Sequence, residues 1–303
     1  MPKVCVIVVT YNGEEYIMKC LSSLQGHSQD LHILVVDNDS KDQTVSIIEH
    51  NFPNVEVIRN KKNLGFGKAN NIGLIQAYKK GYQYFFLLNQ DAWIEGNAIE
   101  QIIAALKTNP SYGIVSPIHL NGTGDRLQHD FKFFMEKNEA SDFLKHYESS
   151  RLNNELYEVD FVNAAAWMIS RIALQKVGLF HPLFFHYGED DNYVHRLHDK
   201  GLKIGVDSNS IIYHDHEIKS FNPLKHKPEK EFKQELLRAY LNPQNRGKRE
   251  ELANYAKKRK RKFKRENSLN GLTASWIKFK TMIEVYNHEK RYYKPLYRHL
   301  NDE

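Results

Sequence analysis

Three adjacent carboxylates, Glu189, Asp190 and Asp191, form the group of side chains in this sequence best suited to acid–base chemistry. They follow a His-Tyr-Gly turn and stand where a helix is expected to begin. One acidic residue there is explained by the preference of helix N-termini for negative charge. Three in a row repel one another, which raises the pKa of at least one carboxyl group. The run therefore favours a general base.

Four further polar clusters follow short apolar runs, at residues 10–12, 37–40, 63–67 and 89–91. In an open parallel sheet, ligands bind beyond the carboxyl ends of the strands. Each cluster alone is explained about equally well as a turn, because Asn, Asp and Gly are common turn residues. Four such clusters at one edge of a sheet indicate a binding site.

A phosphate-bearing ligand at this edge needs a partner for its charge. No Gly-rich dinucleotide fingerprint follows the first apolar run, and the sequence has no Walker A lysine loop. Asp91 is placed to hold a divalent cation, Mn²⁺ or Mg²⁺, that bridges two phosphates. The segment His214-Asp215-His216 offers further metal ligands. A pair of ordinary surface histidines is the commoner explanation of that segment.

The spacing of apolar residues predicts the scaffold that carries these groups. Apolar runs at 4–9, 33–36, 55–58, 84–88 and 114–116 predict buried strands. Between them, helical spacing is expected at 17–24, 67–80 and 97–107, and a Ser40/Gln43 capping box predicts a helix through about residue 50. This alternation predicts an α/β fold with a doubly wound, mostly parallel sheet and helices on both faces.

Residues 119–158 interrupt the alternation and are polar, so we expect an insertion over the active face. Strands are expected again at 159–162, 165–170, 203–206 and 210–213, and helices at 172–177 and 189–200. Residues 1–218 then form one catalytic domain, and residues 219–303 a separate helical region.

Charge divides the chain at the same point. Residues 219–303 contain 23 Lys and Arg against 10 Asp and Glu, whereas residues 1–218 contain 20 against 27. An acidic body and a basic tail indicate different partners. Only two cysteines are present and no apolar stretch approaches a membrane span, so a cytoplasmic protein is expected.

The polar clusters occur in an order that resembles glycosyltransferase family 2, the inverting enzymes of the GT-A fold, and in particular their rhamnosyltransferase-like bacterial branch. The resemblance covers about residues 3–218 and rests on six motifs. These are Val-Val-Thr-Tyr-Asn at 8–12, Val-Val-Asp-Asn-Asp-Ser at 35–40, Asn-Leu-Gly-Phe-Gly-Lys-Ala-Asn-Asn at 63–71, Leu-Leu-Asn-Gln-Asp at 87–91, Phe-Val-Asn-Ala-Ala-Ala-Trp at 161–167 and Phe-Phe-His-Tyr-Gly-Glu-Asp-Asp at 184–191.

The resemblance implies a role for each matching position. Asp190 falls at the catalytic base, with Asp191 and Glu189 as its neighbours, and Asp91 and His214 fall at the metal or diphosphate. The residues implied on the nucleotide-sugar side are Thr10, Tyr11, Asn12, Asp37, Asp39, Asn63, Gly65, Asn70, Asn89, Gln90 and Asp91. Trp167, Trp93 and Tyr187 are candidates for stacking on a sugar or acceptor, and core packing is an equal alternative for both tryptophans.

Three positions depart from the family pattern. Asn89 replaces the first Asp of the metal-binding Asp-X-Asp, which removes one negative charge. Ala164 stands where many relatives have Gly, and His181 stands where an Asp is usual.

The resemblance implies transfer of a sugar from a nucleoside-diphosphate sugar to a glycan or lipid-linked acceptor, with no nucleic acid as partner. A sugar nucleotidyltransferase is an alternative, but residues 10–15 lack the Gly-rich basic loop that a triphosphate needs. A nucleic-acid-binding protein would explain the basic run at 257–265 but not the acidic clusters. A binding module without catalysis is disfavoured because Asp91 and Asp190 are both present.

Aromatic and apolar residues alternate with Lys and Arg in the basic tail, as in Trp276-Ile277-Lys278-Phe279-Lys280. Such a segment suits the surface of an anionic membrane, so peripheral contact at the inner face of the plasma membrane is the hypothesis we prefer. The alternative is that these apolar residues pack on the catalytic domain or on a second subunit.

Overall fold

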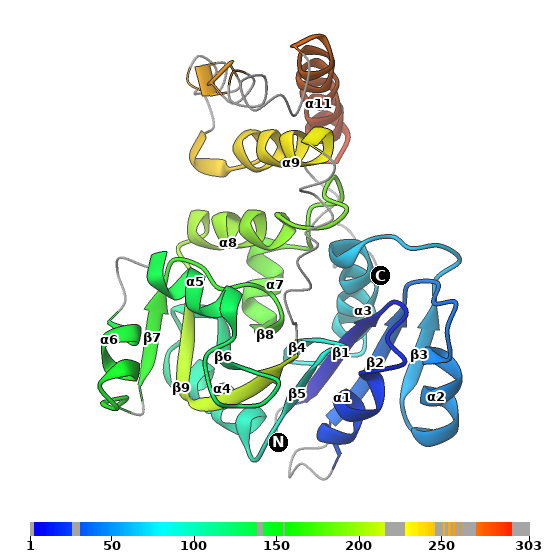
Figure 1. Cartoon of the computed structure of the whole chain (residues 1–303), viewed down its shortest axis with the longest axis vertical. Helices are drawn as coiled ribbons and strands as arrows, with labels where there is room; N and C mark the ends of the chain where they lie inside the picture. The colour runs from blue at the N-terminus through cyan, green and yellow to red at the C-terminus, as the bar shows by residue number, and fades with distance from the viewer. Residues whose placement is uncertain are drawn as a thin grey trace.

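One mixed β-sheet organises the computed structural model (Figure 1). The structure describes residues 3–25, 31–137, 142–153, 155–215, 228–245 and 271–292, with isolated positions between 251 and 261. Within these residues nine strands form a sheet in the order β3-β2-β1-β4-β8-β6-β9-β5, and β7 pairs with β9.

The strands are β1 (Val4–Thr10), β2 (Leu31–Asp37), β3 (Glu56–Arg59), β4 (Tyr84–Asn89), β5 (Ala92–Ile94), β6 (Tyr112–Asn121), β7 (Leu156–Val159), β8 (Ala166–Ser170) and β9 (Lys203–His214). The helices before the C-terminal region are α1 (Ile17–Ser23), α2 (Thr44–Asn51), α3 (Phe66–Lys79), α4 (Ala98–Thr108), α5 (His129–Lys137), α6 (Phe143–Glu148), α7 (Arg171–Val177) and α8 (Glu189–Asp199). The C-terminal region contributes α9 (Pro228–Tyr240), a 3-10 turn at Pro243–Asn245 and α11 (Gly271–Tyr292).

The first four strands of the sheet order are parallel, as the alternating sequence pattern predicts. β1 pairs in parallel with both β2 and β4, and β2 with β3. β8 lies antiparallel between β4 and β6, and β6 is parallel to β9. The fold class is therefore the predicted one, with the carboxyl ends of four strands gathered at one edge.

The sheet has a separate apolar core on each face because side chains alternate along every strand. On one face Val4, Val6 and Val8 pack with residues of α1, α2 and α4. On the other face Cys5 and Ile7 pack with residues of α3, α7 and α8. This arrangement is the two-sided helical cover expected of a doubly wound sheet.

Four predicted elements have bounds that differ from those of the structure. The Ser40/Gln43 capping box does not form: α2 begins at Thr44, whose backbone N–H donates to Asp42 Oδ1 at 3.1 Å. β6 continues past residue 116 to Asn121, and β9 is one strand rather than two. The strand predicted at 159–162 is β7, which ends at Val159.

Residues 119–158 contain the end of β6, α5, α6 and most of β7. Although the segment is polar on average, Phe131 and Phe143 are fully buried and join the core with Tyr157. The Phe143 and Tyr157 rings meet edge to face, with 5.5 Å between their centroids. A few aromatic residues are thus enough to attach this segment to the domain.

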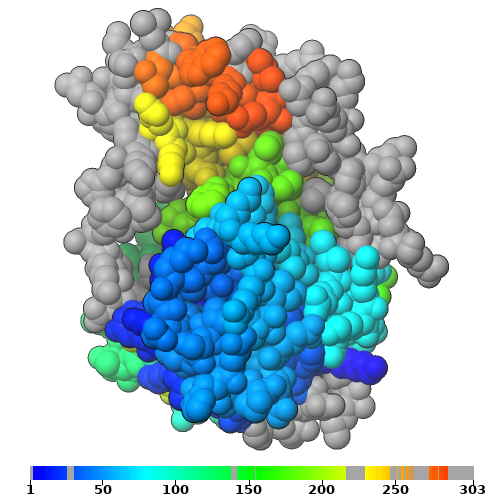
Figure 2. Space-filling model, turned by 90° about the vertical axis from the view of Figure 1, so that its right-hand side faces the viewer, coloured from blue at the N-terminus to red at the C-terminus, as the bar shows by residue number. Residues whose placement is uncertain are grey.

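The C-terminal helices stack on the domain above α8 (Figure 1). Leu237 and Leu241 in and after α9 pack with Phe184, which precedes α8, and with Val285 of α11. Figure 2 shows the same stacking after a quarter turn, with α9 in yellow and α11 in orange. None of the described helices is long and apolar enough to cross a membrane.

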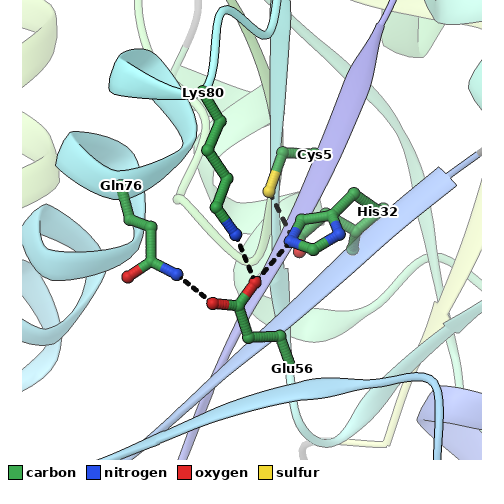
Figure 3. A network of polar contacts seen from close by, with 6 residues as sticks. Cys5, His32, Glu56, Gln76 and Lys80 are labelled. Carbon is green, nitrogen blue, oxygen red and sulfur yellow. Dashed lines mark hydrogen bonds and ion pairs between the residues drawn. The ribbon is translucent and has the colours of Figure 1, made fainter.

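A charged cluster ties the amino ends of β2 and β3 to the end of α3 (Figure 3). Glu56 accepts hydrogen bonds from Lys80 at 2.6 Å and from Gln76, and lies 2.8 Å from His32 Nε2. Burial acts to raise the pKa of Glu56, but the bonds and charges of Lys80 and His32 outweigh it and lower that pKa. The cluster lies at the end of the sheet opposite the predicted binding edge.

We expect Glu56→Gln to destabilise the fold by about 1–2 kcal/mol, because it removes charge-assisted bonds that are one third exposed. A lowered pKa means that this contribution is present at neutral pH and lost as the pH falls through the folded-state value. Urea unfolding at two pH values measures it. Glu49→Gln, which removes an exposed pair with Arg59, is the control and should change stability by less than about 0.5 kcal/mol. Equal effects of the two variants would contradict the prediction.

Candidate active site

The structure brings the predicted strand ends together at one edge of the sheet. Thr10, the last residue of β1, is in register with Asp37 at the end of β2. Val9 is in register with Asn89 at the end of β4, and Asp37 with Arg59 at the end of β3. Three of the polar clusters therefore lie side by side, and the loop after β3 carries the fourth.

Gln90 braces the segment that follows β1. Its Oε1 accepts a hydrogen bond from Thr10 Oγ1 at 2.6 Å and another from the Tyr11 backbone N–H at 2.9 Å. Its Nε2 donates to the Tyr11 carbonyl at 3.3 Å. Thr10 is fully buried, whereas the Tyr11 side chain is exposed. Tyr11 is thus held in place by its backbone, with its ring accessible to a ligand.

Asn12 and Asp39 adopt left-handed backbone conformations, with φ of 48° and 72°. Asn12 Oδ1 accepts from the Lys41 N–H at 2.8 Å, and the buried Asp37 carboxylate accepts from the Ser40 N–H at 3.2 Å. Asp39 pairs with Lys41 Nζ at 2.6 Å. The Asn12–Lys41 bond joins the loop after β1 to the loop after β2, and the other two interactions brace the loop after β2. The side chains of the two loops therefore form one wall.

Asn38 is a residue of this wall that the sequence did not single out. It is buried, and its Oδ1 accepts from Asn60 Nδ2 at 3.0 Å and from the Leu64 N–H at 3.1 Å. Its Nδ2 donates to the Gly65 carbonyl at 3.3 Å. Asn38 therefore joins the loop after β2 to the loop after β3. Its place inside the Asp-Asn-Asp cluster was the available signal.

The loop after β3 passes very close to the segment before α8. Gly65 has φ of 84°, and a Cβ there would lie 1.8 Å from the Phe185 carbonyl oxygen. Asn63 Oδ1 accepts from the Gly65 N–H at 2.8 Å, which fixes the turn. Asn70 is buried and donates to the Phe66 carbonyl at 3.1 Å, so its role here is within α3.

We expect Gly65→Ala to be strongly destabilising, and Gly81→Ala separates the two reasons for it. Gly81 has almost the same φ, 82°, but nothing lies within 4 Å of an added Cβ. Gly81→Ala should cost about 1–2 kcal/mol for backbone conformation alone. Gly65→Ala should cost about 1–3 kcal/mol more, because the methyl group displaces the 185 segment. Thermal unfolding of both variants measures the difference, and equal losses would show that the close approach is unimportant.

Asp91 and His214 meet beyond the ends of β4 and β9. Asp91 Oδ1 lies 3.3 Å from His214 Nε2, and Asn89 Nδ2 lies 3.4 Å from the same nitrogen. His214 is buried with 3% of its surface exposed, and the Asp91 side chain keeps 18%. The Asp91 carbonyl also accepts from the Asp215 N–H at 2.9 Å. The two sequence-predicted ligands are therefore neighbours, whereas His216 lies outside the described residues.

This donor set fits a divalent cation that a ligand helps to hold. A carboxylate oxygen and an imidazole nitrogen, already 3.3 Å apart, are both accepted by Mn²⁺. No group of three or more His, Cys, Asp and Glu residues suited to a metal occurs within the described parts of the chain. The remaining coordination positions would go to phosphate oxygens and water, as is usual for cations that bind with phosphate.

The three carboxylates begin α8, as predicted, after Gly188 in a left-handed conformation. Glu189 is buried, and Asp190 and Asp191 are half-buried. Burial, and then the charge of Asp190, raises the pKa of Glu189 to about 8. Burial, and then the charge of Asp191, raises the pKa of Asp190 to about 6. Asp190 is thus a carboxylate with raised basicity that retains exposed surface.

The segment 164–165 connects the carboxylates to the end of β4, two residues before Asp91. The Ala165 carbonyl accepts from the Asn89 N–H at 2.9 Å, and the Ala164 backbone forms a hydrogen bond with the Asp190 carboxylate. Glu189 also lies beside α3, because a Cβ at Gly67 would meet Glu189 Cβ at 3.4 Å. The acidic run, the loop after β3 and the end of β4 therefore surround one site.

The three aromatic candidates have different surroundings. Trp167 is fully buried, donates from Nε1 to the Val162 carbonyl at 3.2 Å and stacks near Phe180, so in this structure it is a core residue. Trp93 is half-buried on β5, stacked 5.6 Å from the Tyr213 ring. Tyr187 is 40% exposed at the turn before the carboxylates. Tyr187 alone of the three adjoins the acidic run in sequence.

His181, which the resemblance marks as a departure from the family pattern, has a definite structural role. Its Nδ1 accepts a hydrogen bond from the Leu183 N–H at 3.3 Å, and its carbonyl accepts from the Phe184 N–H at 3.3 Å. An Asp side chain commonly accepts from the backbone two residues on in the same way. The departure therefore preserves the turn that leads to Phe184.

Comparison with known proteins shows the family and the fold. Residues 5–178 match the family model described as "Glycosyl transferase family 2". The chain is 30% identical over 157 residues to the teichoic acid poly(glycerol phosphate) polymerase of Staphylococcus epidermidis, covering 48% of this chain and 21% of that protein. It is 22% identical over 245 residues to the N-acetylglucosaminyl-diphospho-decaprenol L-rhamnosyltransferase of Mycobacterium tuberculosis, covering 73% and 79%.

Solved structures share the fold. The S. aureus protein TarS, residues 1–349 in complex with UDP-GlcNAc, is similar with a TM-score of 0.58 and 16% identity, over 98% of this chain and 79% of that one. GalNAc-T7 with UDP, GalNAc and Mn²⁺ is similar with a TM-score of 0.56 and 16% identity, over 73% and 45%. The chain thus spans about a fifth of the polymerase and under half of the GalNAc-T7 chain.

Proposed function

The chain belongs to glycosyl transferase family 2, and on that premise we propose that it transfers a hexosyl or deoxyhexosyl group from a nucleoside-diphosphate sugar to an acceptor hydroxyl with inversion. The observation that carries the proposal is that three groups lie at a single edge of the sheet. They are the wall formed by the loops after β1 and β2, the Asp91–His214 pair and the Asp190 carboxylate. Each part has the chemistry that one component of this reaction needs.

The donor would lie across the ends of the parallel strands. Tyr11, Asn12 and Asp37 would contact the base and ribose. Gln90 holds the Tyr11 backbone, and the bond from the Lys41 N–H to Asn12 Oδ1 holds the two loops against each other. The loop at 63–65 would line the nucleotide side of the site. The TarS and GalNAc-T7 structures contain UDP-sugar and UDP respectively, which supports a uridine or related nucleotide as the first donor to test.

Asp190 would act as the general base. The acceptor O–H bond breaks as its proton passes to the Asp190 carboxylate, and the acceptor oxygen forms a bond to the anomeric carbon. The bond from that carbon to the diphosphate breaks, and its electron pair leaves with the nucleoside diphosphate. A positioned base of matched pKa contributes about 10²–10⁴-fold to such a step.

Asp91 and His214 would hold a divalent cation, Mn²⁺ or Mg²⁺, beside the diphosphate. A cation bound there neutralises the negative charge that develops on the leaving group, worth several kcal/mol. The GalNAc-T7 structure contains Mn²⁺, which supports testing that ion first. Asn89 lies 3.4 Å from His214 and would orient the imidazole rather than add charge.

The acceptor would be a glycan or lipid-linked saccharide of a bacterial cell surface. Two similar proteins carry names that refer to teichoic acid and to a decaprenol-linked sugar, which supports this class. Tyr187 and Phe185 expose their rings directly before the carboxylates, where they are available to stack on an acceptor sugar.

The experiment that tests the proposal is a thermal-shift screen of the full chain against UDP, GDP and dTDP and their sugars, with Mn²⁺ or with EDTA. A donor present at 100 times its Kd stabilises the fold by about 2.7 kcal/mol. The stabilising sugar nucleotide is then incubated with lipid-linked acceptors and the release of nucleoside diphosphate is followed. A chain that no nucleoside diphosphate stabilises would refute the proposal.

We also propose that the C-terminal region contacts an anionic membrane. One face of α11 packs on α9 through Ala274 and Val285. Trp276, Met282 and Ile283 on α11 are exposed by 63%, 47% and 42%. Exposed apolar residues within a region of net charge +13 suit a surface of anionic lipid, where each nearby Lys or Arg contributes about 1 kcal/mol.

Co-sedimentation with vesicles of neutral or anionic phospholipid tests the contact. Binding should need anionic lipid, weaken with salt, and fall when Trp276 and Ile283 are both replaced by Ser. Replacing Ile172, which is 58% exposed on the catalytic domain, is the control and should leave binding unchanged. Protein that remains in the supernatant at low salt would assign the exposed face to a protein partner instead.

A further inference from the structure

Helix α9 of the C-terminal region contacts both the turn before α8 and the first turn of α8, which carries the three carboxylates. Gln234 Nε2 donates to the His186 carbonyl at 3.0 Å, before the carboxylates. One turn along α9, Arg238 Nη1 lies 3.3 Å from Asp191 Oδ2. These two contacts lie on either side of Asp190 in the chain. They come from a helix 47 and 48 residues further along the sequence.

Apolar packing fixes α9 at this place. Phe184 is 1% exposed and packs with Leu237, Leu241 and Val285. Asn192 in α8 is fully buried and donates from Nδ2 to the Leu241 carbonyl at 3.0 Å. The C-terminal region is therefore attached at both ends of the segment 184–192, and Arg238 lies between these attachments.

Gly188 lets the Arg238 stem lie directly on the loop. Its φ is 90°, and a Cβ at that position would lie 3.2 Å from both Cγ and Cδ of Arg238. The backbone of the turn before the carboxylates thus adopts a conformation that favours glycine, and the arginine covers it. The guanidinium group then reaches Asp191 and leaves the neighbouring Asp190 with exposed surface.

The charges around Asp191 show what this contact does. Glu189 and Asp190 precede it on α8, and His195 lies within electrostatic reach on the same helix. Arg238 faces it from α9, with Tyr255 near the guanidinium, and Asp130 of α5 acts on Tyr187. Arg238 brings a positive charge into direct contact with this acidic run, and it pairs with the carboxylate that most strongly repels Asp190.

We propose that Arg238 is a positioning residue for catalysis: by pairing with Asp191 it fixes the carboxylate run so that Asp190 is the group presented to the acceptor. Gln234 assists by holding the His186 carbonyl at the other end of the turn. This inference rests on the proposed function, since it presupposes Asp190 as the base. It makes the C-terminal region a part of the active site.

Steady-state kinetics of Arg238→Ala in the full chain tests the proposal. We expect kcat to fall between about tenfold and a hundredfold, with the donor KM changed by less than about threefold, because the base is misplaced and the donor site is not touched. The acidic limb of the kcat/KM profile should move to higher pH by about half a unit, the effect of one charge lost at a partly exposed site. Arg238→Lys keeps the positive charge, so its acidic limb should lie at the same pH as that of the unmodified chain.

Lys233→Ala is the matched control on the same helix. Lys233 pairs with Glu284 of α11 at 2.6 Å. Its removal takes away an ion pair of α9 without altering the contacts to His186 and Asp191. Its kcat and pH profile should match those of the unmodified chain. A loss equal to that of Arg238→Ala would show that the region is merely stabilising and would overturn the proposal, as would a normal pH profile for Arg238→Ala.

Hydrogen exchange of the peptide covering residues 184–194, measured without substrate, separates this proposal from the proposed function. Arg238→Ala and Gln234→Ala should each speed exchange there by at least about tenfold, and Lys233→Ala should not. Unchanged exchange in both variants would overturn the positioning role. Faster exchange in a protein that transfers no sugar would retain the contact but refute the proposed function on which the catalytic role rests.

Discussion

Asp190→Asn is expected to lower the rate of sugar transfer by about 10²-fold or more while leaving donor affinity nearly unchanged. The asparagine side chain retains an oxygen for the backbone bonds that Asp190 accepts from Asp191, at 2.9 Å, and from Ala164. It cannot take up the acceptor proton. The measurement is kcat together with the Kd of the nucleoside diphosphate.

The pH profile gives a second test of the same residue. The pKa of Asp190 is raised to about 6, so kcat/KM of the unmodified chain should fall about tenfold per unit below that pH as the base becomes protonated. A pKa raised in the folded state also means that the charged carboxylate opposes folding at neutral pH. Asp190→Asn should therefore unfold at the same temperature as the unmodified chain, or higher.

Asp191→Asn is the variant to compare with it, because it keeps Asp190 but removes the carboxylate that pairs with Arg238. It keeps the base, removes its most repulsive neighbour and leaves the Arg238 charge uncompensated. Both changes lower the pKa of Asp190, so the acidic limb should move down, opposite to the shift expected for Arg238→Ala. An active Asp190→Asn with an inactive Asp191→Asn would place the base one residue later. Activity in both variants would remove this segment from proton transfer.

The parts of the site that lie next to strands could be predicted from sequence, because a buried parallel strand is a continuous apolar run and its end is visible. Thr10, Asp37 and Asn89 follow such runs directly, and the structure places all three at one edge. The same rule fails when a strand contains polar residues. Ser116 ends the predicted strand and His119 begins the predicted insertion, yet both belong to β6, are fully buried and bond to each other at 3.0 Å. Because the two polar side chains bond to each other in the interior, this part of the strand does not show as a continuous apolar run in the sequence.

Contacts between distant elements account for what the sequence did not reveal. Asn38 joins two loops through three side-chain hydrogen bonds, but its side chain type suits an ordinary turn. Arg238 and Gln234 lie in a charged helix with no motif, and their role arises only because Phe184 attaches that helix above α8. Trp167 illustrates the reverse case, since a motif residue in the site region lies in the core.

Asp91→Ala is expected to abolish the Mn²⁺-dependent part of nucleotide binding without disturbing the fold. Its carboxylate faces His214 at 3.3 Å, whereas its contact with the Asp215 N–H is made by the backbone and survives the substitution. Even an outer-shell change at a metal site costs about 10–100-fold in affinity, and loss of a direct carboxylate ligand should cost at least that. Isothermal titration of the nucleoside diphosphate with Mn²⁺ and with EDTA measures the effect.

The comparison with His214→Ala and Asn89→Ala decides how the cation is held. If His214 is a ligand, His214→Ala should also lose most of the Mn²⁺ dependence, while Asn89→Ala, which alters only a 3.4 Å contact to the imidazole, should lose less. If the imidazole merely supports Asp91, His214→Ala and Asn89→Ala should lose similar amounts of the Mn²⁺ dependence. Asp39→Ala is the control. It removes an ion pair with Lys41 in the loop after β2, so it should weaken binding equally with and without metal. Equal affinities with Mn²⁺ and with EDTA in the unmodified chain would remove the cation from the reaction and leave the diphosphate charge to the protein alone.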